Sequence, residues 1–268
     1  MSEAVWMRPT KRVSQEKKFG LSGSTLKWIA VVTMLIDHVG AAVLLRVYRT
    51  NCFRLTTEGL RQLVLVYRVM RAIGRVAFPI YCFLLVEGFR RTGNALKYAL
   101  RLFLFALISE IPFDLAFHSQ ILETEYQNVF FTLFFGLAAM IAADAICRRW
   151  LKEEWTLRYR ILEMVVVGGC TAVAAGMAWL LRTDYSWKGV GCIMIMYLFR
   201  RNKTTQIAAG ISSFLWENTA FLAFIPIALY NGKRGLKMKY FFYIFYPAHL
   251  LVLYFICRLL GIAECSAF

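Results

Sequence analysis

The stretch LKWIAVVTMLIDHVGAAVLL, residues 26–45, decides the fold class. It is an apolar run whose ionisable residues are Lys27, Asp37 and His38. A straight helix needs about 20 predominantly apolar residues to cross the hydrocarbon core of a bilayer. The run therefore predicts a membrane-spanning helix, with Ser22 or Ser24 as its N-cap.

The rest of the chain repeats this character. Of the 268 residues 59% are apolar and 18% charged, against about 45–50% and about 25% in soluble domains. Several of the further apolar runs are shorter than a span, and short or broken helices are tolerated at membrane depth where they line an enclosed cavity. We expect an all-α, polytopic integral membrane bundle of eight or nine segments around a central cavity. The runs cover about 60–89, 95–117, 129–147, 162–181, 190–199, 207–216, 221–230 and 240–260.

The net charge of +16 gathers at the ends of these runs. Basic residues at helix ends are typical of cytoplasmic connections that face anionic lipid, so we expect lipid rather than nucleic acid as the partner. Residues 118–127 and 217–219 hold no Lys or Arg, whereas the connections between them are basic. This alternation predicts a multi-pass protein of the inner, cytoplasmic membrane with a cytoplasmic N-terminus. The expected parts are a basic segment over 1–23, one membrane domain over 24–262 and a short tail over 263–268.

One basic region breaks the alternation. Arg61, Arg68, Arg71 and Arg75 stand at i, i+7, i+10 and i+14, which places them on one stripe of a helix. An arginine that faces lipid costs about 2.5–3.5 kcal/mol or more. The stripe therefore indicates an anion site in a cavity, or a helix on the membrane surface whose arginines snorkel. One long inward-crossing helix over 60–89 would reconcile the stripe with the topology.

Asp37 and His38 lie about three turns into the first run. Ionisable groups at membrane depth are functional candidates, and histidine is the usual general base near neutral pH. Lys27 precedes His38 by eleven residues, so the two share a helix face about 16 Å apart. This spacing would let Lys27 hold a phosphate at the cytoplasmic mouth while His38 meets a reactive group deeper inside.

Further polar residues interrupt the later runs. Glu87, Glu110 and Asp114 either form salt bridges with the arginine stripe or line the cavity. Asn128 is a helix-end hydrogen-bonding residue or a ligand contact, and His249 stands near the start of the last run. Three scattered histidines and cysteines without a CxxC pair predict no metal site.

Five stretches of the chain resemble the TraX family. They are Leu26–Gly40, Arg71–Pro79 with Phe83–Phe89, Leu107–Asp114, Gln127–Leu133 and Tyr246–Leu250. The best-known member of that family is implicated in acetylating the N-terminal amine of a conjugative pilin. The family is similar to the wider transmembrane acyltransferase group, which includes the acyltransferase-3 enzymes. Those enzymes carry a basic residue, ten others and a histidine, as Lys27 and His38 do here, and an Arg-x-x-Arg, which 68–71 matches.

The resemblance implies an integral-membrane acyltransferase that takes acetyl from cytoplasmic acetyl-CoA, its co-substrate, with no permanently bound cofactor. His38 would be the catalytic base or would briefly carry the acyl group itself, with Asp37 or Glu87 orienting it. Lys27, Arg68, Arg71 and Arg75 would hold the CoA phosphates, while Glu110, Asp114, Asn128 and His249 would contact the acceptor. The acceptor stays open between peptide, glycan and lipid, because the extra helices and extracytoplasmic domain of many such enzymes are missing here. The alternatives are a small ion-coupled transporter and a non-catalytic assembly factor for a surface structure.

Overall fold

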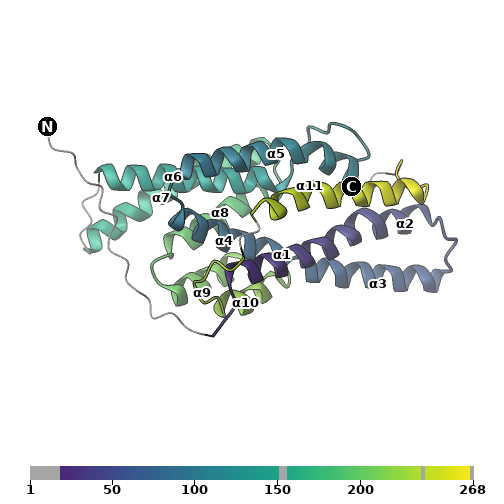
Figure 1. The fold of residues 1–268 in the computed structure, drawn as a ribbon, viewed down its shortest axis with the longest axis horizontal. Coiled ribbons are helices and arrows are strands. Elements are labelled where there is room, and N and C mark those ends of the chain that lie inside the picture. Colours follow the sequence, from purple (N-terminus) through teal and green to yellow (C-terminus); the bar gives the residue numbers. More distant parts are fainter. Residues whose placement is uncertain (1–18, 151–155, 237–238, 266–268) are drawn as a thin grey trace.

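A computed structural model describes residues 19–150, 156–236 and 239–265. Within these ranges the ordered elements are helices, as expected, and most of the basic segment predicted over 1–23 lies outside them. Backbone groups in a membrane must be satisfied internally, which is why apolar sequence of this kind folds into helices. The elements run in the order α1 Gly23–His38, η1 Val39–Leu44, α2 Leu45–Thr50, α3 Thr57–Gly74, α4 Ala77–Arg91, α5 Ala95–Phe117, α6 Val129–Trp150, α7 Leu157–Leu180, α8 Ser186–Leu198, α9 Lys203–Ser213, η2 Ala220–Ala223, α10 Phe224–Ala228 and α11 Lys239–Leu259 (Figure 1).

Five stretches of the described chain are long and apolar enough to cross a membrane: Gly23–Thr50, Thr57–Arg91, Val129–Trp150, Leu157–Leu180 and Tyr240–Leu259. Helix α5 is as long as a span but carries Lys97, Arg101, Glu110 and Asp114. The shorter helices α8, α9 and α10 complete the set. The prediction of a helical membrane bundle with some short segments is confirmed.

The first helix is longer than its apolar run and changes its winding at the site. Ser22 is the N-cap, since its hydroxyl accepts a hydrogen bond from the Thr25 N–H at 3.2 Å. Directly after His38 the helix widens into the π-helical turns of η1 and then continues as α2 to Thr50. The helix thus continues past the apolar run of 26–45. Arg46 is fully buried in α2, and its guanidinium donates to carbonyl oxygens of Ala42, Ala116 and Cys265.

The second long segment is broken. The run over 60–89 was expected to be one helix, but α3 ends at Gly74 and α4 begins at Ala77. The Thr219 hydroxyl donates to the Ala72 carbonyl at 2.6 Å, so a side chain from a distant loop occupies one of the end carbonyls of α3. The break lies beside Asp37, and this makes it part of the site.

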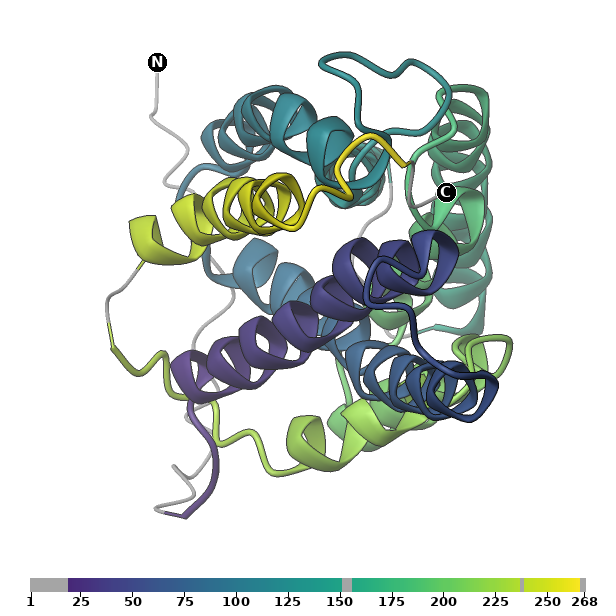
Figure 2. The ribbon, with the colours of Figure 1, turned by 90° about the vertical axis from the view of Figure 1, so that its right-hand side faces the viewer.

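The bundle has a proximal end and a distal end. At the proximal end α1 begins, and the connections 92–94, 199–202 and 229–236 meet there. The distal side carries the connections 51–56, 118–128 and 181–185. The helices are staggered, so that α2, α3 and the end of α11 extend furthest distally while the connected ends of α6 and α7 extend furthest the other way (Figure 1). Seen along the bundle, α4 lies in the interior with the other helices around it (Figure 2).

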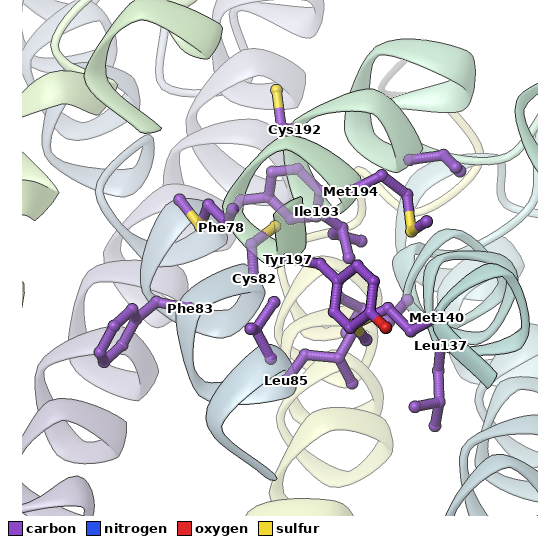
Figure 3. Packing of buried hydrophobic residues seen from close by; sticks show 14 of the residues in the cluster. Phe78, Cys82, Phe83, Leu85, Leu137, Met140, Cys192, Ile193, Met194 and Tyr197 are labelled. Carbon is purple, nitrogen blue, oxygen red and sulfur yellow. The ribbon is translucent and has the colours of Figure 1, made fainter. Parts of the chain in front are cut away.

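The main core lies between α4, α6 and α8. Phe78, Cys82 and Leu85 of α4 face Leu137 and Met140 of α6, and Ile193, Met194 and Tyr197 of α8 close the cluster (Figure 3). Small residues allow this approach. A Cβ at Gly136 would lie 2.6 Å from the Ile193 side chain, and a Cβ at Gly189 would lie 2.7 Å from that of Thr132. Close packing through small residues is the usual basis of helix association in membranes.

Candidate functional site

Two cavities lie one behind the other along the axis of the bundle. The distal cavity has a volume of about 120 Å³, and Asp37, His38, Arg71, Tyr126 and Asp184 are in its wall. The proximal cavity has a volume of about 450 Å³ and includes Lys27, Glu87, Arg91, Arg101 and Arg234. Met34, Tyr81, Val129 and Tyr246 line both. One layer of side chains therefore separates the two.

His38 and His249 form a hydrogen-bonded pair at the wall of the distal cavity. Nδ1 of His38 lies 2.7 Å from Nε2 of His249, and Nδ1 of His249 lies 2.8 Å from the Phe245 carbonyl oxygen. The rings are nearly parallel, at 7°, and His38 meets Phe117 edge to face. The proposed sequence role of His249 was acceptor contact. In the structure its contacts are with the ring of His38 and its own helix.

The backbone carbonyl determines how the protons are arranged in this pair. A carbonyl accepts only, so Nδ1 of His249 carries the hydrogen and, in the neutral ring, Nε2 is an acceptor. Nδ1 of His38 must then donate to it, which leaves the lone pair of His38 on Nε2. This is the tautomer that a general base on the distal cavity requires.

Asp37 contacts an arginine rather than the neighbouring histidine. Its Oδ2 accepts from Nη1 of Arg71 at 2.5 Å, and its Oδ1 is buried without a hydrogen-bond partner among the described residues. Gly74 makes room for it, since a Cβ there would lie 2.1 Å from Oδ1. The expected orienting contact from Asp37 or Glu87 to His38 is thus made by His249.

Two connections cover the distal cavity. The Tyr126 hydroxyl donates to Oδ1 of Asp184 at 2.7 Å, and the backbone N–H of Asp184 donates to the Gln127 carbonyl at 2.8 Å. The Thr132 hydroxyl also donates to the Asp184 carbonyl. The Asp184 carboxylate raises the pKa of Tyr126, and burial adds to this, so the phenol remains a donor. Asp184 and Tyr126 were not predicted as site residues.

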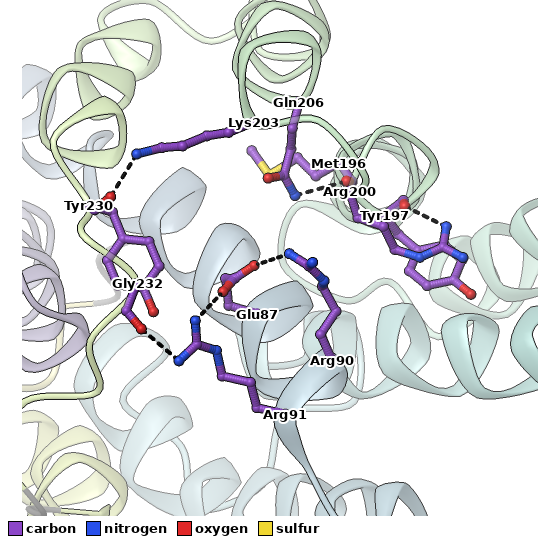
Figure 4. A network of polar contacts seen from close by, with 10 residues as sticks. All are labelled: Glu87, Arg90, Arg91, Met196, Tyr197, Arg200, Lys203, Gln206, Tyr230 and Gly232. Atoms are coloured by element: carbon purple, nitrogen blue, oxygen red, sulfur yellow. Dashed lines mark hydrogen bonds and ion pairs between the residues drawn. The ribbon is translucent and has the colours of Figure 1, made fainter. Parts of the chain in front are cut away.

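The proximal cavity is rich in positive charge. Lys27 lies on α1, as the spacing to His38 predicted, and Arg101 comes from the first turns of α5. Glu87 is the carboxylate in this wall, and it pairs with Arg90 at 2.7 Å and Arg91 at 3.1 Å. Arg91 also donates to the Gly232 carbonyl at 2.7 Å (Figure 4). Glu87 therefore lies at the opposite end of the two-cavity system from His38.

The arginine stripe is divided among different surroundings. Arg71 lines the distal cavity, Arg75 pairs with Glu217, and Arg61 is exposed beside Glu58. Arg68 is exposed on α3. None of these four lines the proximal cavity in which Lys27 lies. The structure therefore does not bring Lys27 together with Arg68, Arg71 and Arg75.

Glu110, Asp114 and Asn128 form a buried polar group beside the cavities. The Asn128 amide donates to Glu110 and, at 2.8 Å, to the Ala106 carbonyl, while Asp114 accepts from the Glu123 N–H at 2.8 Å. These contacts tie α5 to the 118–128 connection and the start of α6. The described walls of the two cavities contain none of the three. The salt bridges to the arginine stripe that Glu87, Glu110 and Asp114 could have formed do not occur here, and Asp37 and Glu217 take those arginines.

The sequence held weak signals for the residues that were missed. Asp184 stands with three aromatic or hydroxyl neighbours between two apolar runs, which is an unusual place for a single acid. The π-helical turns after His38 have no simple sequence signature, although such turns occur frequently at functional sites. Without the fold, the connection 181–185 could not be placed beside Asp37 and His38 at the end of α1.

The fold and site define a polytopic helical membrane protein with a histidine pair beside a small distal cavity and a larger basic cavity proximal to it. The family model described as TraX protein matches residues 22–257, and the chain belongs to this family. It is also similar to the probable fimbrial assembly protein FimC, serogroup H1, of Dichelobacter nodosus. The two are 24% identical, and the match covers 88% of this chain and 96% of the relative. No solved structure matches the chain.

Proposed function

We propose that this protein is an integral-membrane acyltransferase, and that His38 is its general base. The observation that carries the proposal is the His38–His249 pair, because its proton arrangement leaves a free lone pair on Nε2 of an intramembrane histidine that lines a cavity. A histidine needed only for packing would not require a second histidine bound to a carbonyl. The TraX membership and the Lys27–His38 spacing support the same reading.

The donor in this proposal is acetyl-CoA from the cytoplasm, which reaches His38 from the proximal side. The acceptor amine or hydroxyl enters the distal cavity, and its nitrogen or oxygen attacks the thioester carbonyl. Its proton passes to Nε2 of His38, the carbon–sulfur bond breaks, and His38 returns the proton to the departing thiolate. The products are the acylated acceptor and free CoA. An amine acceptor needs such a base because an α-amino group, with a pKa of about 7.7–8.0, is mostly protonated near neutral pH.

A transfer assay on membranes tests the proposal. Membranes of a deletion strain, supplied with the wild-type chain, are incubated with radiolabelled acetyl-CoA, and acetylated peptides and glycans are identified by mass spectrometry. We expect at least one surface peptide or glycan to carry label only when the chain is present. Equal labelling with and without the chain would contradict the proposal.

The orientation on which the donor side depends has a native probe. Cys52 lies in the distal connection and is exposed, whereas the other described cysteines are buried or half-buried. With the N-terminus in the cytoplasm, an impermeant thiol reagent should label intact cells, and Cys52→Ser should abolish this labelling. Labelling that appears only after the membrane is opened would reverse the orientation.

A second candidate is a non-catalytic factor for the assembly of a surface fibre, favoured by the name of the Dichelobacter nodosus relative, a probable fimbrial assembly protein. The two candidates differ in what His38→Ala does. An assembly factor that acts by contact should still support fibre formation with this variant. An acyltransferase should lose acetylation, and any fibre defect should match that of the deletion strain.

A further inference from the structure

We infer that the proximal cavity is a phosphate-binding site for a nucleotide, with Lys27, Arg101 and Arg234 as its ligands. The inference rests on the proposed function for the identity of the nucleotide, coenzyme A, and on the structure for the residues. The wall of this cavity carries an excess of positive charge. Four cations, Lys27, Arg91, Arg101 and Arg234, stand against the single carboxylate of Glu87 among the described lining residues.

Most of these cations have no carboxylate partner among the described residues. Arg91 is occupied by Glu87 and by the Gly232 carbonyl. No described carboxylate lies within ion-pair distance of Lys27, Arg101 or Arg234, and Nε of Arg101 is buried without a hydrogen-bond partner. The neighbours of Lys27 and Arg101 are aromatic: the Phe242 ring lies 5.2 Å from the Lys27 ammonium and the Tyr98 ring 5.8 Å from the Arg101 guanidinium. Cations left unpaired in a cavity favour an anionic ligand, and arginine binds two phosphate oxygens at once.

Backbone hydrogen bonds hold two of the cavity's cations close together. Lys27 and Arg234 lie close enough to repel each other. They cannot separate easily, because the N–H groups of Gly23 and Ser24 donate to the carbonyls of Lys233 and Arg234 at 2.8 and 3.0 Å. The Leu236 N–H donates to the Ser24 hydroxyl as well, at 3.1 Å. A rigid pair of repelling cations is stabilised when an anion lies between them.

The position of the cavity favours a nucleotide over a lipid phosphate. Arg234 is exposed in the connection between α10 and α11, and Gly93 of the connection between α4 and α5 also lines the cavity. The cavity is therefore bordered by connections at the proximal end, where water reaches. Lys27 lies near this end of α1, about 16 Å along the helix from His38. A ligand with its phosphates at Lys27 and a long uncharged arm would bring a thioester towards the histidine pair.

Binding measurements on the purified full chain in nanodiscs test the inference. Calorimetry with CoA is carried out on the wild type and on Lys27→Gln, Arg101→Gln and Arg234→Gln. The matched control is Arg258→Gln, since Arg258 is an exposed arginine in the last turn of α11 and lies outside the cavity. We expect each cavity variant to bind CoA roughly tenfold to a hundredfold more weakly, as the loss of one charge-assisted hydrogen bond implies. Arg258→Gln should bind like the wild type, and Arg101→Lys should fall in between.

Binding measurements with other ligands show which part of CoA the cavity recognises. Pantetheine, which has the arm without the nucleotide, should bind much more weakly than CoA. Its affinity should differ little between the wild type and the cavity variants. A short-chain phosphatidic acid that displaces CoA no better than a neutral lipid supports the nucleotide. One that binds more tightly than CoA, with the same dependence on Arg101, would overturn the nucleotide in favour of a lipid phosphate. Thermal unfolding of each variant shows whether it is folded.

The outcomes also distinguish this inference from the proposed function. CoA binding that is equal in the wild type and all three cavity variants would overturn the inference while acetyl transfer by the wild type continued. CoA binding weakened as expected, with no acetyl transfer to any acceptor, would keep the site and overturn the acyltransferase. No CoA binding by the wild type at millimolar concentration would overturn both.

Discussion

The two cavities treat their positive charges in opposite ways. In the distal cavity the guanidinium of Arg71 is neutralised by Asp37, and its neighbour on α3, Arg75, pairs with Glu217. In the proximal cavity Lys27, Arg101 and Arg234 line one wall without a described carboxylate as an ion-pair partner, and Lys27 and Arg101 lie over aromatic rings. A cation that is already paired holds helices together, whereas an unpaired one in a cavity is available to a ligand. The pattern of pairing, rather than the number of arginines, separates a structural region from a binding region.

Removing the base should give the largest effect. His38→Ala deletes the proposed base in the wall of the distal cavity, and general-base catalysis contributes about 10²–10⁴-fold to a rate. We expect acetyl transfer to fall by this factor while CoA binding at the proximal cavity is unchanged. The measurement is transfer from radiolabelled acetyl-CoA, with calorimetry on the same preparation.

His118→Ala is the control for that change. His118 is half-buried at the end of α5 and packs near Phe113 and Tyr126, and it is not among the described residues that line the distal cavity. It should keep most of the activity. If His38→Ala retained the turnover of His118→Ala, the distal cavity would not be the place of the chemistry.

A glycine gives the next test, because it controls the space for Asp37. In Gly74→Ala the new Cβ would meet Asp37 at 2.1 Å, so the carboxylate and the Arg71 ion pair must move. A misplacement of about 1 Å in an active site can cost about 10²-fold in rate, and we expect a loss of that order together with a lower melting temperature. Transfer assays and thermal unfolding measure the two.

The matched control is Gly176→Ala in α7. No atom lies within 4 Å of its added Cβ, and alanine is favoured over glycine within a helix by about 1 kcal/mol. This variant should be as active as the wild type and at least as stable. Equal behaviour of Gly74→Ala and Gly176→Ala would mean that the position of Asp37 is irrelevant to the distal cavity.

The orienting residue should have a smaller effect than the base it orients. His249→Ala removes the acceptor that holds Nδ1–H of His38, so the ring samples both tautomers and more than one orientation. We expect roughly a tenfold to hundredfold loss of turnover with little change in CoA affinity. His249→Gln places an amide oxygen near the former Nε2 and should recover part of the loss.

A structural role alone predicts a different result for the same pair of variants. If His249 only packs against Phe245, glutamine and alanine should lower stability without a difference in turnover between them. The pH profile adds a second readout, because the loss of a neutral acceptor changes the proton equilibrium of His38 only if the two rings share the hydrogen bond. An identical profile in both variants and in the wild type would argue against the positioning role.

Most of the helical framework could be predicted from the sequence, because apolar runs of spanning length have few alternatives in a membrane. Lys27, Asp37 and His38 could be singled out as well, since ionisable residues stand out in such runs. The partners could not. Asp37 or Glu87 was expected to orient His38, but neighbouring residues of a helix point about 100° apart, and long-range packing gave that role to His249.

The arginine stripe illustrates the same limit from the other direction. Its helical spacing is real, but spacing says which residues share a face and nothing about what that face meets. Asp37 comes from α1 and Glu217 from the segment before η2, and only the fold brings them to Arg71 and Arg75. The donor-binding role predicted for Arg68, Arg71 and Arg75 stays a prediction, and CoA calorimetry on an Arg68→Gln variant would test its exposed member.

The smallest effect belongs to the ion pairs of α3, and they allow the finest comparison. Asp37→Asn and Glu217→Gln are equivalent changes. Each keeps the size of the side chain and removes the negative charge that pairs with an arginine of α3. A hydrogen bond to a charged group contributes about 1.5–3 kcal/mol, and both pairs are partly exposed, so we expect each variant to lose at most about that much stability. If both pairs only hold α3, turnover should fall severalfold and equally. If Asp37 also acts on the distal cavity through its unpaired Oδ1, Asp37→Asn should lower turnover further than Glu217→Gln at equal stability. Thermal unfolding and transfer assays on both variants decide this, and a larger loss of turnover in Glu217→Gln would remove Asp37 from the chemistry.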